Sequence, residues 1–161
     1  MITCHFENGD IVGLRHAIVS VIIIKDRKVL LGRRGTFRGK PILESGKWSL
    51  IGGFVDRDET LIEAAKREVM EETGLKVKNL VLFNIVDNPV RPKDNGRQNI
   101  AMIFIAGVIN QKPTVNEEVT DLKWFDLDNL PPKKEMAFDH NDSLVLYKKY
   151  IKKKFPLPVF G

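Results

Sequence analysis

The sequence predicts an α/β fold in which a mixed β-sheet is sandwiched between α-helices. Three observations lead to this prediction. Segments typical of strands and of helices follow one another in the order strands, helix, strands, helix, as in a sheet that is covered by helices. Residues 16–24 (HAIVSVIII) are rich in β-branched side chains, as buried strands are. Residues 60–73 have the pattern of a helix, and Gly74 then provides a natural stop.

Further strands are expected where short apolar runs lie between polar turns: residues 29–31, 48–51, 77–86, 98–108 and 122–125. The polar residues 25–28 would join the first two strands as a hairpin. Residues 35–47 would form a long irregular loop, and such loops are commonly functional in compact domains. After Pro131 and Pro132 interrupt the chain, apolar residues at helical spacing predict a second helix over residues 143–154.

The composition restricts the class of protein. A length of 161 residues suits one domain over residues 1–161. With 43% apolar and 29% charged residues, disordered, collagen-like and mucin-like classes are excluded. The longest apolar run, residues 100–106, is far shorter than the roughly 20 residues of a membrane helix, and no signal peptide is visible at the N-terminus. The single cysteine, Cys4, predicts a cytoplasmic protein without an intrachain disulfide.

The net charge of +5 comes from the end of the chain. Without the five lysines near the C-terminus, the rest of the protein is neutral; they are Lys148, Lys149, Lys152, Lys153 and Lys154. A basic tail can help to hold an anionic partner, but it is more often a solvated helix face with a frayed end, and we prefer that interpretation. We therefore expect no membrane partner, and a nucleic-acid partner is disfavoured.

The helix expected at residues 60–73 carries acidic residues on its apolar side. At about 100° per residue, three glutamates continue the apolar stripe rather than opposing it; the residues concerned are Glu68, Glu71 and Glu72 beside Leu61, Ala64 and Ala65. A surface helix normally has its acids opposite the apolar face. Because neighbouring carboxylates repel one another, either some are protonated or cations neutralise them. Mg²⁺ and Mn²⁺ prefer such oxygen ligands. A solvated acidic helix with internal ion pairs is the simpler alternative.

Residues 53–75 resemble the Nudix box of the Nudix hydrolases, G-x5-E-x7-R-E-U-x-E-E-x-G-U with U aliphatic. Every fixed position is matched at the stated spacing, by Gly53, Glu59, Arg67, Glu68, Val69, Glu71, Glu72, Gly74 and Leu75. A pattern of this length is highly specific. Residues 33–34, 124–127 and 137–140 also look like the family, so the resemblance covers most of the chain. One departure is Ile51, where many members have proline.

The resemblance implies the Nudix fold and hydrolysis of a nucleoside diphosphate linked to another moiety, by attack of water on the pyrophosphate. It implies Mg²⁺ as the cofactor, for which Mn²⁺ can substitute. Glu68 and Glu72 would ligate the metal directly, and the Gly53 carbonyl and Glu71 would complete the shell, directly or through water. Arg67, with a glutamate of the preceding loop, would orient these ligands. Such ions neutralise phosphate charge and activate water.

Outside the box, Glu118 is our choice for an additional metal ligand or general base, with Glu117 second. The alternative is a surface loop that happens to carry two acids. The catalytic residues implied by the resemblance are Glu71, Glu118 and Arg67. Arg33, which follows the strand expected at residues 29–31, would bind a substrate phosphate through a charge-assisted hydrogen bond, whereas Arg34 would face solvent.

The loops, rather than the box, choose the substrate. Pro89 lies fifteen residues after Gly74, a spacing that marks family members acting on ADP-ribose. The resemblance therefore favours ADP-ribose or a nucleotide sugar as the small-molecule partner. The alternative is a sanitising nucleoside triphosphate pyrophosphatase, acting for instance on oxidised dGTP, and a remote alternative is a non-catalytic nucleotide-sensing module. A homodimer is compatible with the sequence.

A nucleobase could stack on an aromatic ring in such a site. Phe37, Phe54 and Phe83 are the candidates, although aromatic side chains more often belong to the core. The three histidines are scattered through the chain, and we interpret them as structural.

Overall fold

A computed structural model describes residues 2–90, 98–109 and 112–161. The strands, in chain order, are β1 (Ile2–His5), β2 (Ile11–Leu14), β3 (His16–Lys25), β4 (Lys28–Arg34), β5 (Thr36–Phe37), β6 (Lys40–Pro41), β7 (Trp48–Ser49), β8 (Val77–Val86), β9 (Asn99–Val108), β10 (Val119–Asp126) and β11 (Val159–Phe160). The helical segments are α1 (Leu61–Thr73), a short 3-10 turn (Lys133–Glu135) and α2 (His140–Lys152). None of the helices in these described ranges is long and apolar enough to cross a membrane.

The main sheet has seven strands and mixed direction. Its order is β10-β4-β3-β9-β8-β11, and β7 pairs with β4 beside this path. The central strands β3 and β9 are parallel, with His16 opposite Asn99 at one end and Ile24 opposite Gly107 at the other. The strands β8 and β11 are also parallel, whereas the other neighbours are antiparallel. The prediction of a mixed sheet is therefore confirmed.

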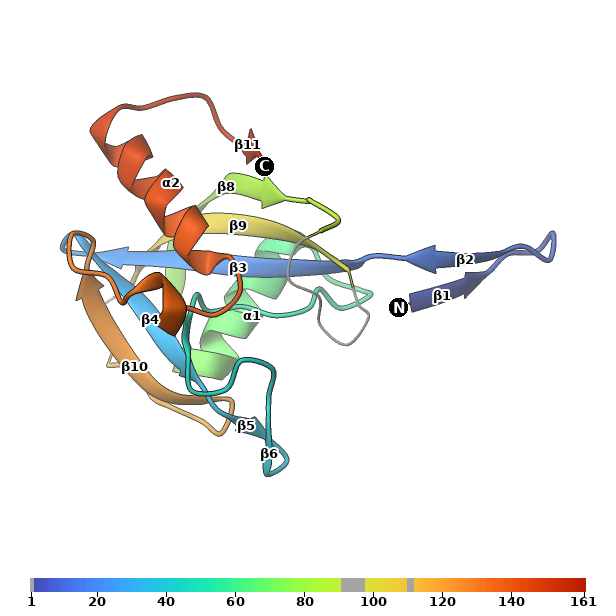
Figure 1. Cartoon of the computed structure of the whole chain (residues 1–161), viewed down its shortest axis with the longest axis horizontal. Helices are drawn as coiled ribbons and strands as arrows, with labels where there is room; N and C mark the ends of the chain where they lie inside the picture. The colour runs from blue at the N-terminus through green and yellow to red at the C-terminus, as the bar shows by residue number, and fades with distance from the viewer. Residues whose placement is uncertain (1, 91–97, 110–111) are drawn as a thin grey trace.

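The two helices cover opposite faces of this sheet (Figure 1). Alternate residues of β3 point to opposite sides, so Val21 packs in the cluster that contains Ala65 of α1, and Ile22 packs in the cluster that contains Leu144 of α2. All four side chains are fully buried. This arrangement confirms the expected sandwich of a sheet between helices.

The ends of α1 are determined by local sequence. Thr60 is the N-cap, and its hydroxyl accepts a hydrogen bond from the Glu63 amide while the Glu63 carboxylate accepts one from the Thr60 amide. At the other end, Gly74 has a left-handed backbone (φ 67°), and its amide donates to the Met70 carbonyl. These capping interactions fix both ends of the helix that carries the acidic cluster.

Other elements differ from the sequence-based expectations. The loop at residues 35–47 contains the short antiparallel pair β5–β6. The helix expected at 143–154 begins earlier and ends at Lys152, and the chain then returns to the sheet as β11 instead of fraying. An N-terminal hairpin of β1 and β2, which the sequence did not reveal, extends away from the sheet in line with β3 (Figure 1).

Candidate active site

Two glycines after β7 carry the chain between β3 and α1. Gly52 has φ 150°, and a Cβ there would overlap the Val19 carbonyl oxygen. A Cβ on Gly53 would lie 2.6 Å from Glu68 Oε1. The Gly53 carbonyl accepts a hydrogen bond from the Val19 amide at 2.9 Å. Glycine is therefore required at position 52, and at position 53 it allows the backbone to approach the Glu68 carboxylate directly.

Arg67 connects the loop before α1 to the glutamates on the helix. Its Nε and Nη2 donate to the two carboxylate oxygens of Glu59, at 3.0 and 2.6 Å, and Nη2 also donates to the Phe54 carbonyl at 2.9 Å. Its Nη1 donates to Glu68 Oε1 at 2.8 Å and to Glu71 Oε2 at 3.0 Å. The hydrogen bond from Arg67 lowers the pKa of the Glu59 carboxyl. Arg67 is therefore a positioning residue for this cluster.

The acidic side chains repel one another at the inner end of the cluster. Burial, with smaller contributions from the charges of Glu68 and Glu118, raises the pKa of Glu72 to about 8, against the hydrogen bond that Glu72 Oε2 accepts from the Gly52 amide at 3.1 Å and against the charge of Arg34. Burial also raises the pKa of Glu68, with smaller contributions from neighbouring carboxylates and against the effect of Arg67. The cluster thus holds negative charge that the protein neutralises only in part.

The donor chemistry of the cluster fits a divalent cation. Carboxylate oxygens dominate, and the Gly53 carbonyl retains a second lone pair beside Glu68. Within the described ranges, no three acidic, histidine or cysteine side chains are grouped closely enough to hold one ion. Arg67 pairs with both Glu68 and Glu71, so its guanidinium neutralises part of the charge of these carboxylates.

Of the two acids in the loop before β10, Glu118 is the one that reaches the cluster. Its charge contributes to the raised pKa of both Glu68 and Glu72. The loop is attached to α1 because Asn116 Nδ2 donates to the Glu71 carbonyl at 2.9 Å. Glu117 is exposed, and its carboxylate instead accepts a hydrogen bond from the Arg38 amide at the β5–β6 turn. The geometry therefore favours Glu118 over Glu117, in the order that we expected from the sequence.

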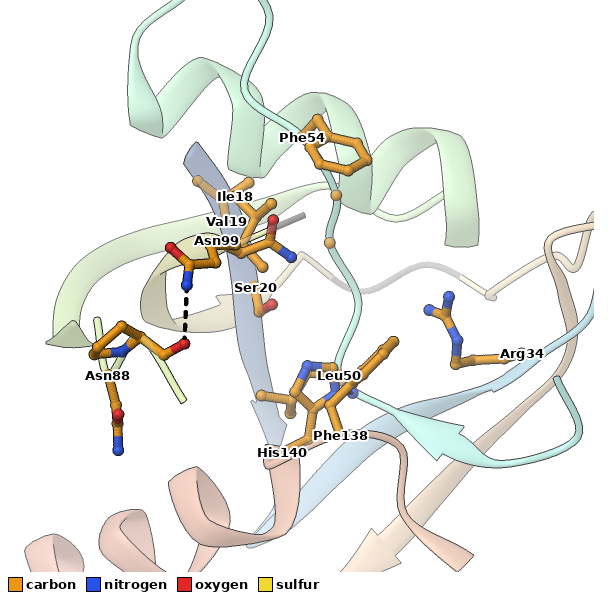
Figure 2. A pocket seen from close by; sticks show the side chains of 14 residues that line it. Ile18, Val19, Ser20, Arg34, Leu50, Phe54, Asn88, Asn99, Phe138 and His140 are labelled. Carbon is orange, nitrogen blue, oxygen red and sulfur yellow. Dashed lines mark hydrogen bonds between the residues drawn. The ribbon is translucent and has the colours of Figure 1, made fainter. Parts of the chain in front are cut away.

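A pocket of about 830 Å³, including its open mouth, lies beside the glycine pair. Figure 2 shows the aromatic rings of Phe54 and Phe138 at opposite ends of this pocket. The polar lining includes the amides of Asn88 and Asn99 and the guanidinium of Arg34. Because Gly52 and Gly53 also form part of the wall, a ligand in the pocket would lie next to the acidic cluster.

The arginine in this pocket is Arg34 rather than Arg33. The Arg34 guanidinium lies 5.0 Å from the centre of the Phe138 ring, and the side chain lines the pocket. Our expectation that Arg34 faces solvent was therefore wrong. Arg34 Nε also donates to the Leu43 carbonyl at 2.7 Å, whereas Arg33 Nε donates to the Gly46 carbonyl at 3.0 Å and lies 5.9 Å from the Trp48 ring, outside the pocket wall. Successive residues of a strand point to opposite faces, so only one of the two can face the pocket. The alternation of β4 would have indicated which one.

Most of the other residues that line the pocket were not proposed as site residues from the sequence. Phe54 was one of three aromatic candidates and does line the pocket, whereas Phe83 is buried in the core and Phe37 is 48% exposed elsewhere. No sequence feature of Phe138 by itself indicated a functional role. His140 is both structural, as predicted, and part of the wall: it is buried, and its Nδ1 accepts a hydrogen bond from the Leu50 amide at 3.1 Å.

Comparisons with known proteins identify a family and similar sequences. Residues 14–147 match the NUDIX domain family. The chain is 36% identical over 137 residues to the ADP-ribose pyrophosphatase of Methanocaldococcus jannaschii, covering 84% of this chain and 75% of the relative. It is 33% identical over 116 residues to the oxidized purine nucleoside triphosphate hydrolase of Mus musculus, covering 69% and 66%.

Solved structures show the same architecture. The MutT NUDIX hydrolase from Burkholderia pseudomallei superposes with a TM-score of 0.69 at 28% identity, covering 83% of this chain and 98% of that one. The family match spans most of the chain, and the archaeal relative exceeds 30% identity over three quarters of its own length. The chain therefore belongs to the Nudix hydrolases, a family of pyrophosphohydrolases that generally use divalent metals.

Proposed function

We propose that the protein hydrolyses the diphosphate of ADP-ribose, or of a related nucleotide sugar, and releases a nucleoside monophosphate. The observation that carries this proposal is the position of the pocket. It opens beside Gly53 and the acidic cluster, and its wall contains both apolar rings and a cation, Arg34. A nucleoside diphosphate has two parts that complement this wall: a planar base, which can pack against the rings, and a strongly anionic diphosphate, which can bind the cation. The similarity to an archaeal ADP-ribose pyrophosphatase supports the choice of substrate.

In this proposal Mg²⁺, or Mn²⁺ in its place, is held by Glu68, Glu72 and the Gly53 carbonyl, with Glu71 and Glu118 close by. When bound, the ion supplies charge neutralisation and an activated water. The protein's own side chains position the metal ligands and bind the substrate. Arg67 keeps the glutamates in place through the contacts described above, and Arg34 faces the phosphates from the pocket wall.

Glu118 is the proposed additional ligand or general base, because it approaches the cluster on a loop that is attached to α1. A base must lie within reach of the proton that it removes, and Glu117 points to the β5–β6 turn instead. Arg33 is placed less favourably for a phosphate than Arg34, so we transfer the proposed phosphate contact to Arg34.

A nucleoside triphosphate pyrophosphatase is the second candidate, and the similarity to the murine hydrolase of oxidised nucleotides supports it. A purely sensing module is disfavoured because all four box glutamates are present, at positions 59, 68, 71 and 72. The cytoplasmic location and a homodimer stay predictions from the sequence.

Purified protein with Mg²⁺ should convert ADP-ribose to AMP and ribose 5-phosphate. A parallel panel of nucleoside triphosphates, oxidised dGTP and nucleotide sugars would rank the alternatives by kcat/KM. The matched control is E72Q, which keeps the size of the side chain but removes its charge. Turnover of triphosphates without any turnover of ADP-ribose would overturn the substrate assignment and leave the reaction class standing.

A further inference from the structure

The backbone of Phe138, in the wall of the pocket, has an uncommon conformation. Its φ is 52°, in the left-handed region that bulky side chains rarely adopt. Such a conformation persists only where the surroundings determine it, and it tends to occur at ligand sites. Its ring nevertheless lines the pocket beside the acidic cluster. A strained position that presents a flat ring to a pocket calls for an explanation beyond packing.

Three hydrogen bonds hold the segment around Phe138 against the loop that contains β7. The Phe138 amide donates to Glu44 Oε2 at 3.1 Å. On one side the Ala137 amide donates to the Trp48 carbonyl at 2.7 Å, and on the other the His140 imidazole accepts from the Leu50 amide at 3.1 Å. The ring is thus positioned before any ligand arrives, which lowers the entropic cost of binding.

Glu44 links this segment to a cationic neighbourhood. Although burial acts in the opposite direction, hydrogen bonds from Lys47 and from the Phe138 amide lower the pKa of Glu44, and the charge of Arg34 adds to this effect. The Arg34 guanidinium also lies 5.0 Å from the Phe138 ring centre, within the range of a cation–π contact. One end of the pocket therefore presents an aromatic ring and a phosphate-binding group side by side.

The ring at the other end of the pocket is the more exposed of the two. Phe54 is 39% exposed and makes a tilted contact with His16 at 5.4 Å between ring centres. Its backbone lies in the loop that Arg67 attaches to the helix. No left-handed backbone conformation fixes the direction of its side chain. Of the two rings, Phe138 is the less exposed and is the one whose backbone is left-handed.

We propose that Phe138 is the specificity-determining residue on which the nucleobase of the substrate stacks, and that Glu44 is the residue that positions it. The ligand class, a nucleoside diphosphate, rests on the proposed function. The stacking role also predicts which part of the ligand Phe138 recognises. Phe138 should contribute to binding of the base and leave binding of the sugar phosphate unchanged.

The test compares AMP with ribose 5-phosphate, which lacks only the base. Both are titrated calorimetrically into the Mg²⁺-loaded protein. Base stacking on an aromatic ring corresponds to about a 5- to 150-fold gain in affinity. We expect Phe138→Leu to lose most of this gain for AMP, with the affinity for ribose 5-phosphate unchanged. Equal weakening of both ligands, or of neither, would overturn the proposal.

Two further variants separate stacking from folding. Phe138→Gly relieves the left-handed backbone while removing the ring, so it should lose AMP affinity without any fall in melting temperature. Phe37→Leu is the matched control, because Phe37 also lies under an arginine, with Arg38 at 5.1 Å from its ring, but outside the pocket wall. It should bind AMP as the wild type does. Full AMP affinity in Phe138→Gly would contradict the stacking role.

Two variants of Glu44 test whether its acceptor oxygen positions Phe138. Glu44→Ala should raise the KM for base-containing substrates with little change in kcat, whereas Glu44→Gln, which retains a carbonyl oxygen for the Phe138 amide, should restore the KM. Failure of the proposed function has a different signature, because wild-type protein would then not cleave ADP-ribose. In that case GMP, CMP and UMP are titrated in the same way. The stacking role fails if no nucleoside monophosphate binds more tightly than ribose 5-phosphate.

Discussion

The carboxylate of Glu68 lies directly against the α-carbon of Gly53, so that a Cβ at position 53 would be 2.6 Å from Glu68 Oε1. Neither residue has room to move toward the other. The backbone of Gly53 and the helix carboxylate are thereby placed side by side, as the proposed metal site needs.

Replacing Gly53 by alanine should therefore displace Glu68 and weaken cation binding. We expect a fall in Mn²⁺ affinity of about 10-fold or more, in the range typical of disturbed metal ligands, measured by titration followed with electron paramagnetic resonance. Gly107→Ala is the control, since a Cβ there would be in ordinary contact with Lys78 at 3.8 Å. Unchanged Mn²⁺ affinity in Gly53→Ala would exclude this carbonyl and carboxylate as a joint site.

Arg67→Lys should lower kcat by about 10- to 100-fold while the fold is retained. Lysine keeps the positive charge but cannot reach Glu59, Glu68 and Glu71 together, as the planar guanidinium does. Steady-state kinetics and circular dichroism are the measurements. The neighbouring exchange Lys66→Arg should have no effect, and wild-type kcat in Arg67→Lys would show that a single charge is sufficient.

In metal-free protein, stability should fall as the pH rises from about 5 to 8. The pKa of Glu72 is about 8 in the folded protein against 4.5 for an unperturbed carboxyl, so the folded state binds more protons than the unfolded state across this window. The free energy of unfolding then decreases with increasing pH. Urea unfolding in EDTA measures this dependence. E72Q should flatten the profile and be the more stable protein at pH 8; parallel profiles would contradict the raised pKa.

Arg34→Gln should raise the KM for ADP-ribose, and Arg33→Gln should leave it nearly unchanged. Arg34 lines the pocket, whereas Arg33 is engaged with the Gly46 carbonyl and the Trp48 ring. Loss of a charge-assisted phosphate contact corresponds to about a 10-fold effect or more. Initial-rate measurements on both variants decide the matter, and the opposite order of KM values would return the phosphate contact to Arg33.

The fold and the acidic cluster were predictable because their signals are local. The spacing of the glutamates on one helix face and the stop at Gly74 belong to a single segment. Even the boundaries of β8 agree with the expected strand at residues 77–86. Periodicity within one element is sufficient for predictions of this kind.

The pocket was not predictable in the same way, because its wall is assembled from segments far apart in the sequence. Arg34, Asn99 and Phe138 meet only through the pairing of strands and the attachment of the segment before α2. No pattern within one segment marks Phe138. The choice of Arg33 rather than Arg34 for the phosphate contact was made without the alternation of side chains along β4, which allows only one of the two to face the pocket.

The parallel pairing of β3 with β9 has a consequence for biosynthesis. The two central strands pair His16 with Asn99, two residues that lie far apart in the sequence. A nascent polypeptide that has emerged only as far as α1 already contains every glutamate of the box, but it lacks the strand against which β3 must pair. Contacts of such long range are slow to form. The acidic helix is therefore synthesised early, yet we expect it to acquire its surroundings only after β9 has been translated.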